Sequence, residues 1–504
     1  MDRIHELLLH PFVFPVVISL FLLWSITKWL RKPVEKTNLP PSPPKLPILI
    51  GNLLPGGRLS LPHQNLYSLA QKHGPLLLLQ LGPIPMLVVS SADAAREIMR
   101  THDLNFANRA SFKVQKKLLY NGKNVSLAPY GEYWRQVKRI VVLQLLSNKR
   151  VQSFRSIREE ETSILMNKIR EHRGRPLNLT DLFSQFTNYV ICKSAFGGQY
   201  NHESENSKKF LVLLDEFSDL LGTVTIGDFV PWLSWISRVN GFDKKVDRFV
   251  KRMDDFLEGV IRDRLETIED DKNIGDNFLD ILLGIYTDNT PDISIDRDSI
   301  KAILLDIFSA GVETTSTAIE WAMAELLRHP TIMEILQNEV REIIKDKNDI
   351  TDDDLEKMQY LKAVIKETLR CHPPIPLLVP KITAKDVKIK GYDVSAGTLV
   401  ITNVWAIGRD PLSWDKPEKF EPHRFLNSSI DFKGLDFELI PFGAGRRSCP
   451  GIAFSNAAIE FVIANLVHKF NWELPDGVEG KDLDMAERSG VTVRKNIPLL
   501  ATAT

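Results

Sequence analysis

Cysteine is scarce in this sequence of 504 residues, which contains only Cys192, Cys371 and Cys449. Three scattered thiols cannot supply the disulfide framework that stabilises small secreted proteins. A basic excess is also absent, because Lys+Arg and Asp+Glu both total 64, whereas a nucleic-acid-binding protein would carry one. We therefore expect free thiols in a reducing compartment and no nucleic-acid partner.

The sequence also lacks internal repeats, low-complexity tracts and, after residue 52, any convincing linker. Its composition, 43% hydrophobic and 25% charged, is ordinary for a globular protein with a large core. Apolar periodicity predicts a single, mainly α domain with a small β part. The expected helices are 299–327, 353–370 and 452–470, and the expected strands are 76–81 and 86–90, paired as a hairpin, with 387–389 and 398–402.

Charge is missing from Pro11 to Thr27, and adding Leu7–Leu9 gives roughly the 20 apolar residues that a membrane-spanning helix needs. The alternative, a cleaved signal peptide, would require a small-residue cleavage site, and none follows. Basic residues follow instead, which by the positive-inside rule keeps this flank in the cytosol. We expect an N-terminal membrane anchor helix at 1–30, a basic and proline-rich linker at 31–52, and one large domain at 53–504.

The helical pattern at 452 follows a glycine-rich segment, PFGAGRRSCPG, at positions 441–451. Cys449 stands close to a helix N-terminus and to two arginines, which predicts a lowered pKa and a thiolate. The glycines let the backbone pass close to a flat ligand, against which Phe442 can pack. The alternative interpretation is a buried cysteine in a glycine-rich turn.

The spacing of Phe442, Gly445, Arg447, Cys449 and Gly451 resembles the Phe-x-x-Gly-x-Arg-x-Cys-x-Gly pattern of cytochromes P450. The resemblance implies the cytochrome P450 fold, a haem b cofactor (iron protoporphyrin IX), and Cys449 as the metal ligand. It also implies that Phe442, Arg447 and Gly451 help to bind that cofactor. A thiolate ligand on haem iron favours cleavage of the O–O bond.

The expected helix 299–327 contains the segment AGVETT at 310–315. Ala310 and Gly311 leave room for a flat ring, and the Thr314 hydroxyl can bond back to the carbonyl of Ala310. Glu313, an acid beside an alcohol, can relay protons; a solvated Glu313 and a helix-bonded Thr314 are the alternatives. The segment resembles the family's Ala/Gly-Gly-x-Asp/Glu-Thr-Thr pattern, which implies catalytic roles for Glu313 and Thr314 and haem contacts for Ala310 and Gly311.

A buried structural triad is implied by a second resemblance. Glu367 and Arg370 resemble the family's Glu-x-x-Arg motif, and Arg424 would be the third member. His423 stands where the family usually has glutamate, which changes a neighbour of the triad and none of its members. A weak surface ion pair is the alternative.

Haem carries two propionate carboxylates, which need cationic or hydrogen-bonding partners. The resemblance implies Trp134, Lys138, Lys381 and Arg447 for this role, with lysine at two positions where relatives often have arginine. Lysine keeps the charge but loses the planar fork of arginine. For Lys138 and Lys381 the alternative is a solvated lysine.

The resemblance covers essentially the whole chain and is closest to plant endoplasmic-reticulum cytochromes P450 of specialised metabolism. It implies a monooxygenase that uses O2, sits in the endoplasmic-reticulum membrane as a single-pass protein in contact with lipid, and keeps its catalytic domain in the cytosol. Because no nucleotide-binding fingerprint is present, the implied electron source is NADPH through a partner, NADPH–cytochrome P450 reductase. The residues Arg135, Lys138, Arg139, Lys149 and Arg150 predict either a basic docking face for that partner or an ordinary solvated surface.

The substrate pocket should be lined mainly by apolar side chains, which predicts a small lipophilic substrate. The resemblance implies a substrate of terpenoid, alkaloid or coumarin type. By family position these side chains are Phe112, Ile307, Ile375, Leu378, Val379 and Val491. Two other functions are kept open: a haem-thiolate isomerase or lyase that needs no external electrons, and a non-catalytic haem protein. The pair Glu313-Thr314 argues against the isomerase or lyase, and the complete Cys449 loop together with that pair argues against the non-catalytic haem protein.

Overall fold

The computed structural model describes residues 38–44, 61–110, 112–271, 275–288, 295–345, 347 and 349–504, together with Ser19, Phe21 and Trp24. The predicted anchor at 1–30 and linker at 31–52 lie outside these residues, apart from the three single positions and 38–44. In the part of the chain that is described, one helix, Arg297–Arg328 (α15), is long and apolar enough to cross a membrane, but 67% of its most apolar window is buried inside the protein. We interpret α15 as a core helix.

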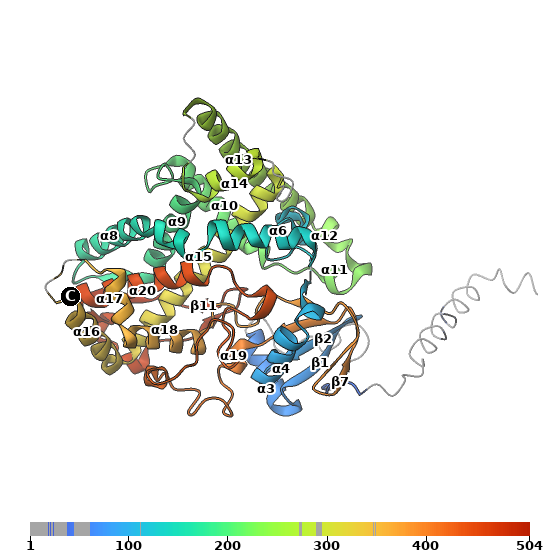
Figure 1. Cartoon of the computed structure of the whole chain (residues 1–504). Coiled ribbons are helices and arrows are strands. Elements are labelled where there is room, and N and C mark those ends of the chain that lie inside the picture. The colour runs from blue at the N-terminus through green and yellow to red at the C-terminus, as the bar shows by residue number, and fades with distance from the viewer. Residues whose placement is uncertain are drawn as a thin grey trace, which may run out of the picture.

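Helices make up most of the described structure (Figure 1). The longest, α15, has 32 residues, and its N-terminus is capped by Asp296, whose carboxylate accepts the Ser299 N–H at 2.8 Å. The other α-helices are α3 (Pro62–His73), α4 (Ala92–Arg96), α5 (Lys113–Leu118), α6 (Glu132–Ile140), α7 (Asn148–Ser153), α8 (Arg155–Glu171), α9 (Leu179–Phe196), α10 (Glu205–Leu221), α11 (Ile226–Phe229), α12 (Ile236–Val239), α13 (Phe242–Asp271), α14 (Phe278–Asp288), α16 (Pro330–Ile344), α17 (Asp352–Lys357), α18 (Gln359–Cys371), α19 (Val404–Ile407) and α20 (Ile452–Lys469).

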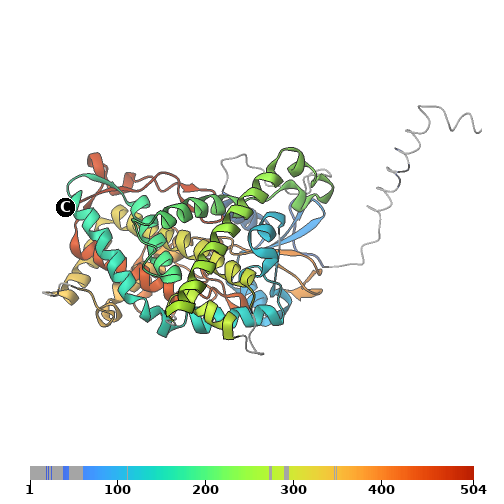
Figure 2. The same cartoon turned by 90° about the horizontal axis from the view of Figure 1, so that it is seen from above.

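Strands form four small sheets among the described residues, the largest with the order β1-β2-β8-β5-β3. The hairpin β1–β2 pairs Leu76 with Val89, and β2 runs parallel to β8. In Figures 1 and 2 this sheet lies at one end of the molecule, beside α3, and helices make up most of the rest. The strands are β1 (Leu76–Leu81), β2 (Ile84–Val89), β3 (Asn108–Arg109), β4 (Pro176–Asn178), β5 (Lys381–Ile382), β6 (Val387–Ile389), β7 (Tyr392–Val394), β8 (Leu399–Thr402), β9 (Trp472–Glu473), β10 (Glu487–Arg488), β11 (Arg494–Lys495) and β12 (Leu500–Ala503).

The core is built around α15, which packs against α9, α18 and α20. Trp321 and Phe308 on α15 are almost fully buried. The approach to α9 is close at Gly311, where a Cβ atom would lie 2.9 Å from the Ile191 side chain. A larger residue at position 311 would therefore force Ile191 to move.

The predicted hairpin, the helix 452–470 and the long helix 299–327 are confirmed within a few residues. The single helix predicted at 353–370 is wrong: α17 ends at Lys357, and α18 begins at Gln359 after Met358 leaves the helical conformation. Glu339 of α16 explains the break. Its carboxylate accepts the N–H groups of Tyr360 and Leu361 at 2.7 and 2.9 Å and so caps a new helix.

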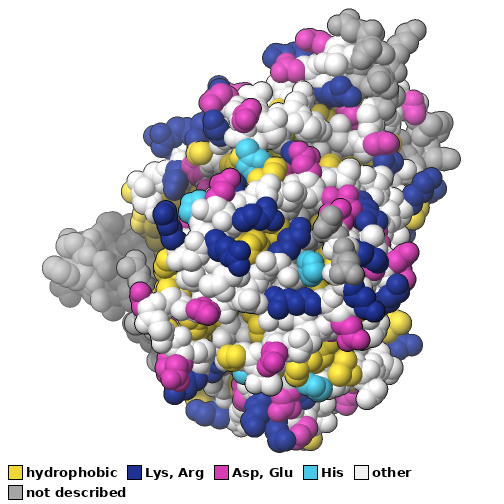
Figure 3. All heavy atoms as spheres, turned by 90° about the vertical axis from the view of Figure 1, so that its left-hand side faces the viewer, with side chains coloured by type: hydrophobic (Ala, Val, Ile, Leu, Met, Phe, Trp, Pro, Cys, Tyr) yellow, Lys and Arg dark blue, Asp and Glu magenta, His cyan; other side chains and the backbone are white. Residues whose placement is uncertain are grey.

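Charges of both signs share the surface, in agreement with a formal net charge of zero. Figure 3 shows the face on the left of Figure 1, where Lys and Arg side chains gather near the middle and Asp and Glu side chains lie around them. This face therefore carries no uninterrupted field of a single sign.

Candidate active site

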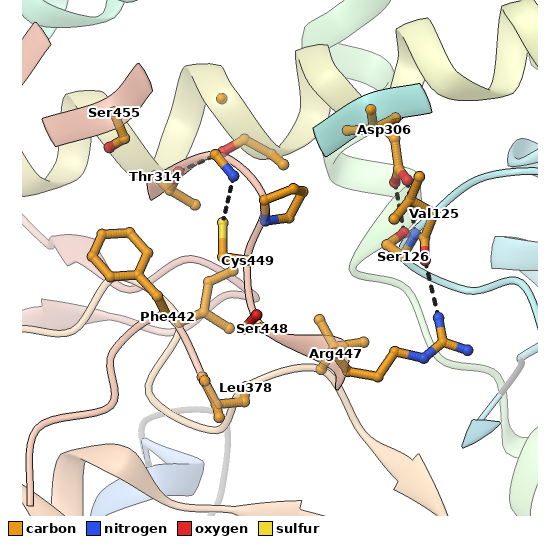
Figure 4. A pocket seen from close by; sticks show the side chains of 18 of the residues that line it. Val125, Ser126, Asp306, Thr314, Leu378, Phe442, Arg447, Ser448, Cys449 and Ser455 are labelled. Atoms are coloured by element: carbon orange, nitrogen blue, oxygen red, sulfur yellow. Dashed lines mark hydrogen bonds between the residues drawn. The ribbon is translucent and has the colours of Figure 1, made fainter. Parts of the chain in front are cut away.

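The Cys449 loop is fixed by its own backbone and by close contacts around its glycines. The Cys449 N–H donates to the Phe442 carbonyl at 3.0 Å, and the Gly451 N–H donates to the Cys449 Sγ at 3.3 Å (Figure 4). Gly445 has φ +69°, and a Cβ atom there would lie 2.1 Å from the Met99 carbonyl oxygen. Only glycine fits this position, which explains its place in the motif.

The thiol of Cys449 corrects one expectation from the sequence. Burial raises its pKa above the ordinary value, although the Gly451 N–H and the charge of Lys138 act in the opposite direction. The surroundings of the loop, taken without a metal, therefore raise the pKa of this thiol and do not lower it as the sequence predicted. Ligation to a metal would remove the proton, because a coordinating thiol is deprotonated outright.

Helix α15 forms the wall of the cavity opposite the cysteine loop, through Ala310, Gly311, Thr314 and Thr315. The Thr314 hydroxyl donates a hydrogen bond to the Ala310 carbonyl, as the sequence predicted. Gly311 lines the cavity, but its missing side chain would point at Ile191 of α9. The glycine thus serves helix packing as well as space in the cavity.

Glu313 does not line the cavity with its neighbours in the helix. Its carboxylate lies 2.6 Å from the guanidinium of Arg494 on β11, and the Glu313 side chain is 24% exposed. The negative charge of Asp215 on α10 also acts at this point, because the charges of Arg494 and Glu313 both influence the pKa of Asp215. Glu313 therefore stands beside the cavity, next to Thr314 in the helix and partly exposed.

Cations that are buried or half-buried line a third side of the cavity, where the sequence implied propionate partners. Lys138 donates to the Ser448 carbonyl at 2.8 Å. Arg447 donates to the Ala107 and Val125 carbonyls at 2.7 and 3.0 Å, and its guanidinium stands 4.2 Å from the centre of the Trp134 ring. Lys381 is 4% exposed. The structure thus brings all four sequence-predicted residues to one wall.

Sequence reasoning missed a fifth member of this wall, Arg109. Its guanidinium donates to the Val379 carbonyl at 2.5 Å and to the Ser126 carbonyl at 3.2 Å. The sequence gives only a weak indication that Arg109 belongs here: it is a single arginine two residues after the apolar pair Phe106-Ala107. No spacing motif marks such a residue, since its neighbours in space come from distant parts of the chain.

Burial and mutual repulsion lower the pKa values of these cations. The pKa of Arg109 falls to about 9 through burial and the charge of Arg447. The pKa of Lys381 falls to about 7 through burial and the charge of Arg109, and that of Lys138 to about 8 chiefly through burial. Within the described residues, none of Arg109, Lys138, Lys381 and Arg447 forms an ion pair with a carboxylate. The wall is therefore electrostatically suited to an anionic ligand.

The triad Glu367, Arg370 and Arg424 forms one buried network. Arg370 is bidentate on Glu367, at 2.7 and 2.8 Å, and Arg424 donates to the same carboxylate at 3.0 Å. Arg370 also donates to the carbonyls of Gly408 and Pro417 at 2.6 and 2.7 Å. The network ties α18 to the segment 408–424 and leaves no charge of the buried pair unmatched.

The predicted pocket residues divide into two groups. Ile307, Ile375, Leu378 and Val379 line the cavity. Phe112 instead packs edge-on against Phe229 with ring centres 5.9 Å apart, and Val491 is 49% exposed; neither lines this cavity. A carboxylate that no motif predicted, Asp306 of α15, faces the cavity beside Ser126 (Figure 4).

Comparison with known proteins agrees with this geometry. The family model described as Cytochrome P450 matches residues 40–501. The chain is 56% identical to Cytochrome P450 71A8 of Mentha piperita over 503 residues, covering 100% of this chain and 97% of that one, and 49% identical to Psoralen synthase of Ammi majus over 495 residues, covering 97% and 98%. A zebra fish cytochrome P450 with abiraterone superimposes with a TM-score of 0.76 at 26% identity, covering 88% of this chain and 99% of that chain. The chain belongs to the cytochrome P450 family and is a monooxygenase of that family.

Proposed function

We propose that the cavity between α15 and the Cys449 loop holds haem b, with the Cys449 sulfur as the iron ligand. The wall of buried cations supports this assignment. Two propionate carboxylates would give four cations the anionic partners that the described protein does not supply. Ala310 and Gly311 on one side and Phe442 on the other provide apolar faces for a flat ring.

Haem iron with a thiolate ligand supplies activation of O2, so that one oxygen atom enters the substrate and the other leaves as water, with two protons and two electrons consumed. The protein's part is to hold that group and to move protons. The Thr314 hydroxyl, bonded to the Ala310 carbonyl, can rotate to donate into the cavity. Glu313, held by Arg494 beside solvent, can replace the proton.

The substrate we propose is a small lipophilic specialised metabolite, which the enzyme hydroxylates or otherwise oxidises. The side chains of Ile303 and Ile307 on α15, with Ile375, Leu378 and Val379 from the segment after α18, support this class, because they give the cavity apolar lining. One similar protein is named Psoralen synthase, in keeping with oxidation of a plant metabolite.

We further propose that electrons come from NADPH through NADPH–cytochrome P450 reductase, and that the enzyme is anchored in the endoplasmic-reticulum membrane by residues 1–30. Arg135, Arg139 and Lys149 are exposed and suit an acidic partner. Lys138 and Arg150 do not belong to that surface, because the first bonds to Ser448 inside the protein and the second pairs with Asp276 at 2.9 Å.

The observation that carries the proposal is the Cys449 sulfur, which faces the same cavity as Thr314 and the buried cations. Cys449→Ser should abolish the red-shifted absorption band of the reduced, carbon-monoxide-bound protein, and with it NADPH-dependent oxidation. Cys192→Ala is the matched control, since Cys192 is buried in α9 away from the loop. A band that survived Cys449→Ser, or that was missing from the unmodified protein, would end the proposal.

The same assay separates the alternatives. An isomerase or lyase would turn over a peroxide substrate without NADPH and reductase, and a non-catalytic haem protein would show the band without turnover. Untargeted metabolite analysis with microsomes, reductase and NADPH would also identify the substrate.

A further inference from the structure

Asp306 places a carboxylate at the cavity, about two turns before Thr314 on α15. A carboxylate that lines a pocket is a group that can anchor a cationic substrate, such as a protonated amine. Whether Asp306 can do so depends on how many of its acceptor positions are already used, because an ionised carboxylate offers about four lone-pair sites.

Three hydrogen bonds from one short loop occupy most of these sites. Oδ1 accepts from the Asn124 side-chain amide at 2.9 Å and from the Ser126 hydroxyl at 2.6 Å. Oδ2 accepts from the Ser126 N–H at 2.8 Å, and the nearby Val125 N–H also acts to lower the pKa of the carboxyl group. Figure 4 shows Asp306 turned toward Val125 and Ser126.

The surrounding charges also disfavour a cation. Arg109 and Arg447 are close enough for the charge of Asp306 to influence the pKa of each. The pKa of Asp306 itself is raised by burial, against the hydrogen bonds from the loop. A cationic substrate would meet the charges of Arg109 and Arg447 beside a carboxylate that already accepts hydrogen bonds from Asn124 and Ser126.

The carbonyl groups of the same loop bind Trp134 and two cations of the wall described above. The Val125 carbonyl accepts from the Trp134 indole at 3.0 Å and from Arg447 at 3.0 Å, and the Ser126 carbonyl accepts from Arg109 at 3.2 Å. Asp306 thus fixes the N–H side of the loop while Trp134, Arg447 and Arg109 bind its carbonyl side. A loop held from both sides has little freedom to shift.

We infer that Asp306 is a positioning residue that latches loop 124–126 to α15, and that the pocket consequently selects neutral substrates over cationic ones. This rests on the proposed function and narrows its substrate class: the enzyme should accept neutral lipophilic molecules and reject permanently charged analogues of the same shape. The latch also positions Arg109 and Arg447 indirectly, through the loop.

The test uses the haem-loaded protein and two probes of equal shape, 3,3-dimethylbutylbenzene and trimethyl(2-phenylethyl)ammonium. The quaternary nitrogen has no lone pair and cannot ligate iron. Binding is followed by the spin-state change of the ferric haem, and backbone order by hydrogen–deuterium exchange. We expect the ammonium probe to bind about 100-fold more weakly than the hydrocarbon, because nothing repays the desolvation of its charge.

Asp306→Asn should leave the ratio of the two probe affinities within about threefold of its original value. Hydrogen exchange at Val125 and Ser126 should accelerate by about tenfold or more, because the variant loses charge-assisted hydrogen bonds to the carboxylate. Ser126→Ala, a milder variant, should accelerate exchange by a smaller factor. The matched control is Ser309→Ala, whose hydroxyl bonds only within α15 in the described structure, to the Asp306 carbonyl at 3.2 Å; it should change neither readout.

The inference is overturned if the unmodified protein binds the ammonium probe as tightly as the hydrocarbon, if Asp306→Asn selectively weakens ammonium binding, or if exchange at 125–126 is unchanged. Should Asp306→Asn fail to fold, the two-probe comparison and Ser126→Ala still decide. The carbon-monoxide band is recorded first for each protein. Its absence from the unmodified protein contradicts the proposed function, whereas a normal band with tight ammonium binding contradicts this inference alone.

Discussion

At the scale of single residues, the Thr314 hydroxyl combines a local bond with a place at the cavity. It donates to the carbonyl four residues earlier, which satisfies the hydroxyl and loosens the helix at that turn. The spacing predicted this bond because both partners lie within one helical turn. Glu313 is different, since its partner Arg494 stands far away in sequence on β11 and could not be inferred from spacing.

Replacing Thr314 with alanine tests the proton relay. Without the hydroxyl, proton delivery should fail more often, so hydrogen peroxide released per NADPH should rise and product should fall by about tenfold or more. Peroxide and product are measured in the reconstituted system. Thr287→Ala is the matched control, because the Thr287 hydroxyl makes the same bond four residues back, at 3.0 Å to Leu283, in α14 and away from the cavity. If Thr314→Ala released no more peroxide and formed no less product per NADPH than the unmodified protein, Thr314 would have no part in the proton relay.

At the scale of elements, the buried triad links α18 to the segment that follows α19. Glu367→Ala would leave Arg370 and Arg424 without their carboxylate, and Arg370 is fully buried. We expect a loss of about 3–5 kcal/mol of stability and little haem-loaded protein, measured as the yield of the carbon-monoxide band. Glu421→Ala should have almost no effect, because Glu421 is 42% exposed and lies 3.5 Å from Arg424. Equal yields from the two variants would refute the structural role.

A second cluster joins the end of α15 to α16 and α18. Glu325 lies 2.7 Å from the His372 ring and 3.2 Å from the His329 ring. Burial alone would raise the pKa of Glu325, but hydrogen bonds from His329 and His372 outweigh it and lower the pKa to about 2. The hydrogen bond to Glu325 in turn raises the pKa of His329.

These two shifts set the sign of a pH dependence. The lowered pKa of Glu325 stabilises the fold above the ordinary carboxyl pKa, and this contribution is lost as the pH falls toward about 2. The raised pKa of His329 stabilises the fold at pH values below the ordinary imidazole pKa. This contribution to stability is lost as the pH rises through the raised pKa of His329. The cluster of Glu325, His329 and His372 therefore contributes most to the stability of the fold at mildly acidic pH.

His329→Gln should accordingly lower the melting temperature more at about pH 5.5 than at about pH 8.5. We expect a difference of about 1–2 °C, small because His329 is one-third exposed in a large protein. Thermal unfolding of the haem-loaded protein measures it. The control, His172→Gln, removes an exposed ring that bonds to the Lys168 carbonyl at 2.9 Å, and it should shift melting equally at both pH values. A pH-independent shift in His329→Gln would contradict the assignment.

At the scale of the whole molecule, the chain balances its charges, so any docking surface must be local. Arg139→Glu with Lys149→Glu should raise the reductase concentration required for half-maximal turnover by roughly tenfold at low ionic strength, and less at high salt. Lys388→Glu, at a side chain 73% exposed on β6, is the control and should leave the titration unchanged. An unaltered titration in the double variant would exclude this docking face.

The sequence by itself determined the features that depend on short spacing. The Cys449 loop, the bond of Thr314 and the pairing of Glu367 with Arg370 each lie within a few residues, so turn and helix geometry fix them before the chain packs. The same local logic failed for the helix break at Met358, because the carboxylate that causes it belongs to another helix.

Only the tertiary structure decided which side chains meet across long separations. Arg109 joined the other cations at the cavity, Asp306 accepted hydrogen bonds from loop 124–126, and Val491 stayed at the surface because of how the helices and the C-terminal strands pack. It also reversed the expected pKa of Cys449, since burial, which no local motif reports, outweighs the hydrogen bond and the nearby charge. Contacts and desolvation are properties of the packed chain, and the order of residues alone does not contain them.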